Sequence, residues 1–350
     1  MRKIDWWLVS PMFLLSILGA IVIRSVAPNL LNFQLLFMAA SLLAFTIFSS
    51  IGHEILSSFI IPLYIISTIS LITPFFFGLQ TRGAHRWIQI AGVSLQPSEI
   101  TKPFFLLTFA HLAKSQSKFR HLHLIGSLVL PGIIIFSQPD LGTTLVLFAG
   151  WLVVFSSQFS LKSTALLATV FLLLIPGSLL LLKPYQKDRL LTFVNPALDP
   201  LGKGYHIIQS IIAVGSGQII GRGLGQGTQS QLRFLPEYHT DFIFASLSEE
   251  LGFLGGIITL LLFSQLLRRM YQISQATKDP SQAVFCVGSF TMLAFQVFIN
   301  IGMNIGLAPV TGITLPFISY GGSSLLSTAI LLGIVNSIST AYNMPYGSRN

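Results

Sequence analysis

The fold class of this chain follows from residues 226–256, QGTQSQLRFLPEYHTDFIFASLSEELGFLGG. The stretch begins in a polar, glycine-rich segment and continues into an apolar run of helical length. The junction between the two carries Glu237, His239 and Asp241. Acidic side chains at the point where a loop becomes a membrane helix cost free energy, so their presence is typical of a functional site. We therefore expect a membrane protein with a polar site at the start of this helix.

Asp241 also admits an interpretation as a helix cap. It follows Thr240 at the start of the helix, and a carboxylate at the N-cap accepts hydrogen bonds from the first backbone N–H groups. Glu249 and Glu250 come later in the same helix. At a rise of about 1.5 Å per residue they lie roughly 12–13 Å deeper than Asp241. The rest of the chain favours the functional interpretation.

The composition is that of a polytopic membrane protein. Of the 350 residues, 52% are hydrophobic and 9% are charged, whereas soluble domains carry about 25% charge. The net charge of +9 comes from Lys and Arg residues that lie mostly in loops between apolar runs. Such residues are typical of topology signals and of contacts with anionic membrane lipids, so we expect no nucleic-acid partner. The single cysteine, Cys286, excludes an internal disulfide.

Apolar runs of about 20 residues, the length that crosses a bilayer, predict about ten transmembrane helices. The candidate spans are 7–26, 30–49, 55–77, 97–114, 123–138, 140–157, 162–182, 241–267, 281–306 and 315–342. We therefore expect an all-α polytopic membrane protein, with residues 1–350 as a single integral membrane domain. A long loop, residues 183–240, separates the seventh span from the eighth.

The Lys and Arg residues of the short loops predict the orientation. Those on the side of the two termini are Arg2, Lys3, Lys114, Lys118, Arg120, Lys162, Arg268, Arg269, Lys278 and Arg349. The short loops of the other side hold Arg24, Arg82 and Arg86. Because cytoplasmic loops are enriched in Lys and Arg, both termini are expected in the cytoplasm. The loop 183–240 and Asp241 are then extracytoplasmic.

Two polar motifs interrupt the apolar sequence. The motif QPSEITK places Glu99 and Lys102 three residues apart, on one face of a helix. Burying an ion pair costs desolvation of both partners, and a structural role in pinning helices and a catalytic role both stay open. The motif QPDLGT places Asp140 directly after a proline in apolar sequence. A helix-capping role and a polar-cavity role fit Asp140 equally well.

The loop 183–240 is basic and rich in glycine. Its cations include Lys203 and Arg233, and together with Arg86 they suit an anionic, phosphate-bearing ligand or lipid headgroups. Its apolar residues are spaced for short amphipathic helices that lie on the membrane. The GxGxGxG pattern at 221–227 is not surrounded by a βαβ unit, which excludes a dinucleotide site. We expect these glycines to let the backbone approach a ligand or another helix closely.

The last third contains NIGMNIGLAPVTGITLPFISYGGSS, residues 300–324, in which glycines and prolines interrupt two apolar runs. Broken backbone at membrane depth is tolerated only where it is buried or lines a cavity. The polar residues expected to line this cavity are Asn300, Asn304, Ser319, Tyr320, Ser323 and Ser324. The sequence contains no zinc-ligand spacing, Ser-His-Asp signature or P-loop.

Together, the motifs resemble the SEDS family (shape, elongation, division and sporulation), whose members include RodA and FtsW. The shared features run in the family's order and cover most of the chain: RWIQIAGVSLQPSEITK, QPDLGT, DPLGKGYHIIQS, GTQSQLRFLPEYHTDFIFASLSEELGFLG and SYGGSS. PVTG at 309–312 is similar to the RodA branch, since FtsW proteins tend to carry a Lys there. His206 and Gln218 depart from the Gln and Gly expected there, outside the acid cluster.

The resemblance implies ten transmembrane helices in the bacterial inner membrane and peptidoglycan glycosyltransferase activity for cell-wall elongation and cell shape. It implies lipid II as substrate, no organic cofactor, and a class B penicillin-binding transpeptidase as partner. The family's essential acid corresponds to Asp241. Residues expected to bind or support the substrate are Glu237, His239, Arg86, Lys203, Arg233, Ser319, Ser323 and Ser324. Residues expected to form a structural pair and cavity are Glu99, Lys102 and Asp140.

The expected reaction is an inverting transfer, because the donor pyrophosphate is α-linked and the polymer is β-linked. A base must take the proton of the acceptor 4-hydroxyl as it attacks, and one carboxylate suffices for this. Basic side chains or a divalent cation, Mg²⁺ or Mn²⁺, would stabilise the leaving pyrophosphate. Two alternatives stay open: a lipid II flippase, which would place critical charges at mid-membrane, and a membrane scaffold for a transpeptidase, which would need no exposed acid.

Overall fold

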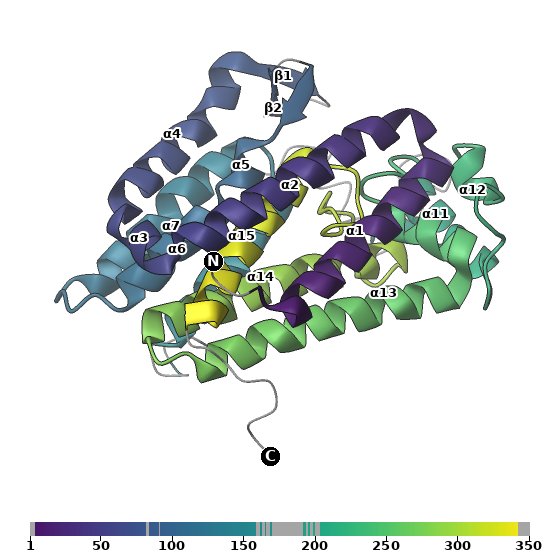
Figure 1. Ribbon diagram of the computed structural model, residues 1–350. Coiled ribbons are helices and arrows are strands. Elements are labelled where there is room, and N and C mark those ends of the chain that lie inside the picture. Colours follow the sequence, from purple (N-terminus) through teal and green to yellow (C-terminus); the bar gives the residue numbers. More distant parts are fainter. Residues whose placement is uncertain are drawn as a thin grey trace.

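The computed structural model describes residues 4–81, 84–90, 92–158 and 204–341, and a few positions between 162 and 199. Its helices are α1 (Trp6–Val26), η1 (Pro28–Leu30), α2 (Leu31–Ile51), α3 (His53–Ser58), α4 (Ile60–Phe77), α5 (Pro97–Ile100), α6 (Lys102–Ala113), α7 (Arg120–Ser137), α8 (Leu141–Ser156), α11 (Tyr205–Ser216), α12 (Thr228–Gln231), α13 (Ile243–Ala276), α14 (Pro280–Asn304) and α15 (Gly322–Ala341). The long helices form a bundle, with a small sheet and the short helices α11 and α12 at one end (Figure 1).

The described helices match the predicted membrane spans. Seven are long and apolar enough to cross a membrane: α1, α2 with η1, α4, α7, α13, α14 and α15. Helix α8 is shorter, and the predicted span 97–114 is divided into α5 and α6. With these, nine of the ten predicted spans have a helix in the structure. The span 162–182 and much of the loop 183–240 lie outside the described residues. The nine helices confirm the expectation of a multi-pass helical membrane protein.

Three features depart from the predicted spans. Helix α13 continues to Ala276, nine residues beyond the predicted end, and α15 begins at Gly322 rather than at 315. A three-stranded antiparallel sheet, β1 (Gly78–Thr81), β2 (Ala84–Ile90) and β3 (Val93–Leu95), follows α4 where a loop was expected. Outside the hydrocarbon layer a hairpin satisfies its own backbone groups, so the chain can leave the bundle there without further helix.

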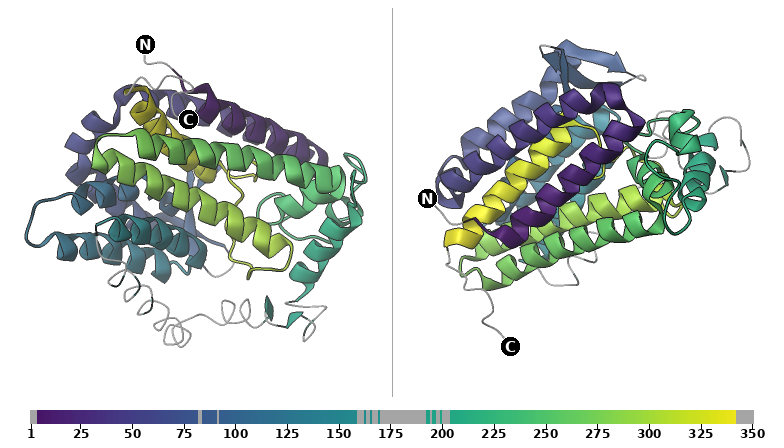
Figure 2. Two further views of the ribbon diagram at one scale, coloured as in Figure 1. Left: turned by 90° about the horizontal axis from the view of Figure 1, so that it is seen from below. Right: turned by 45° about the vertical axis from the view of Figure 1, so that its right-hand side comes forward.

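Helix α15 is the most deeply buried of the candidate spans, with 83% of its membrane window buried. It packs along α2 and against α14, and Figure 2 shows it in yellow running through the middle of the bundle. Small residues permit this position because they let helix backbones approach closely. A Cβ added at Gly333 would lie 2.8 Å from the carbonyl oxygen of Phe45 in α2.

At the end of the bundle that contains the start of α1, a polar cluster joins four helices. Asp5 caps α1 by accepting from the Trp7 N–H at 3.2 Å, and its carboxylate pairs with Arg269 of α13 at 2.8 Å. The Asp5 N–H donates to Asn336 of α15 at 3.0 Å, and Asn336 also donates to Ser49 of α2. Hydrogen bonds of this kind hold membrane helices together where lipid offers no hydrophobic driving force.

Helix α13 is broken at Gly252, which has φ 69° and ψ −166°. The break frees backbone groups on both sides, and the glycine-rich segment 217–225 satisfies them. The four hydrogen bonds are Arg222 N–H to Glu249 C=O at 3.0 Å, Gly223 N–H to Glu250 C=O at 3.0 Å, Phe253 N–H to Gln218 C=O at 2.8 Å, and Leu254 N–H to Ile219 C=O at 3.1 Å. The break is therefore a hydrogen-bonded junction between this segment and α13, in which the freed backbone groups have partners.

Close backbone contact at this junction requires glycine. A Cβ at Gly217 would lie 1.9 Å from the carbonyl oxygen of Ser248, and one at Gly221 would lie 2.1 Å from that of Glu250. Gly221 also has φ 82°, a left-handed conformation that favours glycine. The expectation that the glycine pattern 221–227 permits close approach to a helix is confirmed for Gly221, and Gly217 extends the contact upstream of the pattern.

Candidate functional site

Asp241 lies in a tight loop, residues 237–242, directly before α13. The N–H groups of Thr240 and Phe242 both donate to the carbonyl of Glu237 at 3.1 Å. Glu237 has φ 50°, a left-handed conformation that is uncommon for a non-glycine residue, and its carboxylate accepts from the Thr240 hydroxyl at 3.0 Å. The loop thus holds a compact, defined shape.

Three consecutive carbonyls of this loop are held from the last third of the chain. The His239 carbonyl accepts from the Tyr320 N–H at 2.8 Å, and the Thr240 carbonyl accepts from the Ser319 hydroxyl at 2.7 Å. The Asp241 carbonyl accepts from the side-chain amides of Asn300 and Asn304, each at 3.1 Å. Because every successive peptide is fixed, the position of the Asp241 backbone is determined by the end of α14 and the segment before α15.

Asn304 also stabilises the start of α13. Its Oδ1 accepts from the backbone N–H of Ala245 at 3.0 Å, which satisfies one of the free N–H groups of the first helical turn. The N-cap residue of α13 is Phe242, whose own side chain makes no capping hydrogen bond. The neighbouring helix α14 therefore supplies one cap of α13, and the capping interpretation of Asp241 stays open beside the functional one.

Glu249 and Glu250 hold the glycine-rich loop on α13. Glu249 is fully buried and accepts from the N–H groups of Gln229 and Ser230 at 2.7 and 3.0 Å, and from the Ser230 hydroxyl at 2.8 Å. Glu250 accepts from the hydroxyl of Ser25, at the end of α1, at 2.7 Å. These carboxylates link the loop, α1 and α13, which gives them a structural role in this fold.

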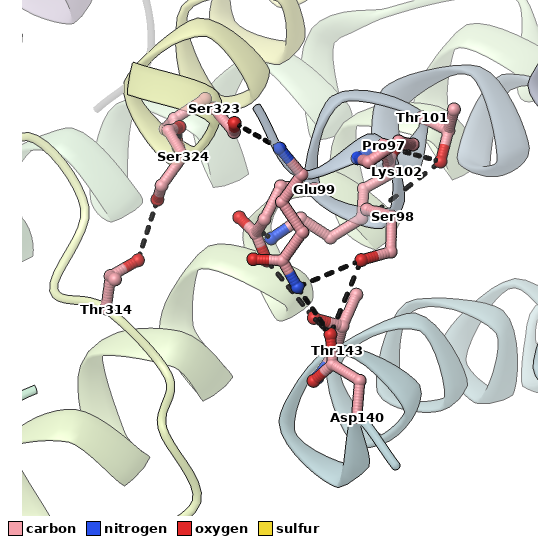
Figure 3. A network of polar contacts seen from close by, with 12 residues as sticks. Pro97, Ser98, Glu99, Thr101, Lys102, Asp140, Thr143, Thr314, Ser323 and Ser324 are labelled. Atoms are coloured by element: carbon pink, nitrogen blue, oxygen red, sulfur yellow. Dashed lines mark hydrogen bonds and ion pairs between the residues drawn. The ribbon is translucent and has the colours of Figure 1, made fainter. Parts of the chain in front are cut away.

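A second polar cluster lies where α5, α6 and α8 meet, and we refer to it as the Asp140 cluster (Figure 3). Lys102 is buried and pairs with Glu99 at 2.8 Å, and Thr143 donates to Glu99 at 3.3 Å. Asp140 caps α8 by accepting from the Thr143 N–H at 3.2 Å, and it also accepts from the Gln96 side chain at 2.6 Å. The capping role considered for Asp140 is therefore present, and its role in a polar cavity stays a prediction.

Arg86 of β2 belongs to this cluster. Its Nε donates to the Gln138 carbonyl at 2.9 Å, another nitrogen donates to the Pro139 carbonyl, and a third lies 3.9 Å from Asp140. The guanidinium therefore fixes the connection between α7 and α8, where the proline leaves carbonyls without helical partners.

The two sites are joined by the segment between α14 and α15. Asn300 donates to the Ile313 carbonyl at 2.7 Å as well as to Asp241. The Ser323 hydroxyl accepts from the Gln96 N–H at 2.7 Å, and Thr314 donates to Ser324 at 2.8 Å (Figure 3). The buried residues of this segment include Leu315, Phe317 and Ser319, whereas Leu307 is exposed. The cavity that the polar residues of the segment were expected to line stays a prediction.

The remaining predicted site residues are placed as follows. His239 packs its ring against Tyr238 and Tyr320, with centroids 5.0 and 5.8 Å away. Arg233 is exposed and has φ 58°, whereas Lys203 lies outside the described residues. The sequence interpretation did not single out Gln96 and Thr143, although both belong to the two proline motifs that supply Glu99 and Asp140.

A divalent cation was one of the two ways considered for stabilising the leaving pyrophosphate, beside basic side chains. Within residues 4–158 and 204–341, as far as they are described, no group of three or more His, Cys, Asp or Glu side chains could hold a metal ion. Glu99 and Asp140 are instead engaged by a lysine and by a side-chain amide, respectively. The divalent cation stays a prediction.

The fold and these two polar sites define a multi-pass membrane protein with a buried polar interior and an acidic loop at one end of the bundle. The sequence pattern of a family described as cell cycle protein, covering FtsW, RodA and SpoVE, matches residues 7–344. The chain therefore belongs to this family, the SEDS proteins.

Individual relatives agree. The peptidoglycan glycosyltransferase MrdB of Escherichia coli K12 is 39% identical over 313 residues, which cover 88% of this chain and 85% of that protein. Stage V sporulation protein E of Bacillus subtilis is 42% identical over 269 residues, covering 75% of this chain and 73% of that protein. The family and the glycosyltransferase class that the motifs predict are confirmed by these matches.

Solved structures share the fold. A chain from a peptidoglycan synthase complex, described as coordinating polymerization and crosslinking, superposes with a TM-score of 0.81 at 32% identity over 98% of this chain and 99% of that chain. The rod shape determining protein RodA of Thermus thermophilus superposes with a TM-score of 0.73 at 27% identity, over the same shares of the two chains.

Proposed function

We propose that this chain is a peptidoglycan glycosyltransferase that polymerises lipid II into glycan strands, with Asp241 as the general base. The observation that carries the proposal is the set of hydrogen bonds to three consecutive carbonyls, which fixes the loop of Asp241 against buried residues. A base contributes to catalysis only when it is held within hydrogen-bond reach of the proton that it takes. A loop whose backbone is fixed by several hydrogen bonds supports such a role.

The reaction forms a bond between the acceptor O4 and the anomeric carbon of the donor, and it breaks the bond from that carbon to the pyrophosphate oxygen. The proton of the acceptor hydroxyl passes to the Asp241 carboxylate as O4 attacks. The electrons of the broken bond leave with the pyrophosphate, which needs charge stabilisation rather than a proton. Inversion follows because attack and departure occur on opposite faces of the sugar.

The leaving pyrophosphate would be stabilised by cations near the Asp241 loop. Arg233 is exposed and lies eight residues before Asp241 in the chain. It is therefore our candidate, among the residues that the structure describes, for a cation that stabilises the pyrophosphate. Lys203 and a divalent cation stay further candidates. Glu237 supports the loop through Thr240, and we assign it a positioning role rather than a role as base.

We infer that Asp241 faces the extracytoplasmic side and that both termini are cytoplasmic. The support is the excess of Lys and Arg in the short loops on the side of the termini. A class B penicillin-binding transpeptidase is the proposed partner, since a similar fold occurs in a peptidoglycan synthase complex.

The test is glycan polymerisation from purified lipid II, with lipid II binding measured on the same preparations. Asp241→Asn keeps the size of the side chain but cannot accept the proton, so polymerisation should slow by about two to four orders of magnitude while binding persists. Glu237→Gln is the matched control and should be milder. Near-normal polymerisation by Asp241→Asn would remove Asp241 from the mechanism and move the search for the base to Glu237 and Asp140. Loss of binding together with activity would assign Asp241 to substrate binding.

A further inference from the structure

Large apolar side chains are exposed around the break in α13. Ile219 and Ile220, in the glycine-rich segment, are 67% and 78% exposed, and Leu224 is 49% exposed. Phe253 and Leu254, on the helix directly after the break, are 63% and 49% exposed. The hydrogen bonds from the Phe253 and Leu254 N–H groups to residues 218 and 219 place loop and helix side by side. The two sets therefore form one apolar surface.

The depth of this surface follows from the length of α13. Arg268 is exposed and is the first charged residue after the break, so it marks the opposite edge of the hydrocarbon layer. Phe253 lies fifteen residues before Arg268, a distance of about 22 Å. The hydrocarbon layer is about 30 Å thick. The break, and the segment paired to it, therefore lie within the membrane rather than above it.

The segment satisfies the conditions for entering lipid. Its backbone groups at the break are paired with α13, which removes the main cost of placing a loop in hydrocarbon. Its apolar surface continues into the exposed stripe of α13 formed by Leu254, Ile258 and Leu261. The exposed Arg222 lies between Ile220 and Leu224, and its long side chain can reach a lipid phosphate from this depth.

We propose that residues 217–224 form a membrane wedge. Ile219 and Ile220 insert into the acyl chains of the leaflet nearest Asp241, and Arg222 binds the phosphate of an anionic lipid headgroup. The wedge is attached to α13 at Gly252, nine residues after the start of that helix. This inference concerns lipid contact and does not depend on the proposed reaction.

The test measures depth by fluorescence, without reference to activity. In a Cys286→Ser background, Ile220→Cys carries an environment-sensitive nitrobenzoxadiazole label, and the protein is reconstituted into vesicles with nitroxide lipids. Leu261→Cys is the control within the membrane and Gln116→Cys, in the exposed loop before α7, is the control in water. We expect acyl-chain nitroxides to quench the label at 220 at least half as strongly as the label at 261. Quenching at 220 by aqueous iodide, at the level of the label at 116, would overturn the proposal.

The role of Arg222 is tested in the same vesicles. Replacing neutral phosphatidylcholine by a mixture with one third phosphatidylglycerol should increase nitroxide quenching at 220. The variant Arg222→Gln should lose most of this increase, whereas Arg233→Gln, a second exposed arginine of the same loop, should keep it. An increase of the same size in Arg222→Gln would overturn the assignment of Arg222 to the lipid phosphate.

Discussion

Asn304 is predicted to be a positioning residue for Asp241, and Asn304→Ala tests this. The side chain is fully buried, donates to the Asp241 carbonyl at 3.1 Å and accepts from the Ala245 N–H at 3.0 Å. Alanine leaves the buried Ala245 N–H without this acceptor, which costs about 1–3 kcal/mol of folding free energy. Asp241 keeps its bond from Asn300, so the loop shifts but does not unfold.

The expected effect on turnover is larger than the effect on binding. A shift of about 1 Å at a catalytic group can cost about 10²-fold in rate. Polymerisation of lipid II by Asn304→Ala should therefore fall by about 10- to 100-fold in kcat, with a smaller change in KM. The variant Asn304→Asp keeps an acceptor for Ala245 but loses the donor to Asp241, and it separates capping of α13 from positioning of the loop.

Asn336→Ala supplies the matched control. Asn336 is also fully buried, but it binds the Asp5 N–H and Ser49 at the other end of the bundle. Its loss should lower the thermal midpoint by a similar amount and leave kcat close to the value of the unchanged protein. If both variants lower kcat in proportion to their loss of stability, Asn304 has no specific role at Asp241 and the reasoning is refuted.

Three other predictions concern structure away from Asp241. Glu99→Ala leaves Lys102 buried without its partner, so thermal unfolding should show a loss of about 3–5 kcal/mol; unchanged stability with lost turnover would instead make the pair catalytic. Cysteines at the exposed Thr228 and Gln116 should react with an impermeant thiol reagent in intact cells and only after lysis, respectively, and the reverse pattern would invert the orientation. Burial lowers the pKa of His53 from 6.5 to about 4. Between these two pH values the unfolded state binds more protons than the folded state, so the free energy of unfolding should fall by about 2 kcal/mol from pH 7 to pH 5. A pH series of unfolding midpoints measures this loss, which the variant His53→Gln should lack.

Structural features that depend only on residues close together in the sequence could be predicted from it. The lengths of the apolar runs predict the helices because crossing a bilayer needs about 20 residues wherever the helix lies. The spacing of Glu99 and Lys102 predicts their ion pair, which forms at 2.8 Å, because residues three apart share a helix face. Asp140 caps α8 because a carboxylate directly before a helix reaches the first free N–H groups.

Other features are local but were not predictable in detail. The sheet at residues 78–95 forms in a stretch rich in turn residues, where pairing depends on strands meeting rather than on any single segment. The break at Gly252 falls inside an apolar run with good helical character, and glycine alone does not break a membrane helix. It occurs because the segment 217–225 supplies partners for the freed backbone groups.

The sequence by itself determined the class of protein, the nine predicted spans that have a helix among the described residues, and the acid directly before α13. Only the tertiary structure decided what holds that acid. Asn300 and Asn304 lie 59 and 63 residues from Asp241 along the chain. The sequence alone predicts each of them only as a polar residue that lines a cavity. A side-chain amide binds whichever backbone group the packing of helices brings to it, so its partner is set by the arrangement of α13 and α14 and not by spacing along the chain.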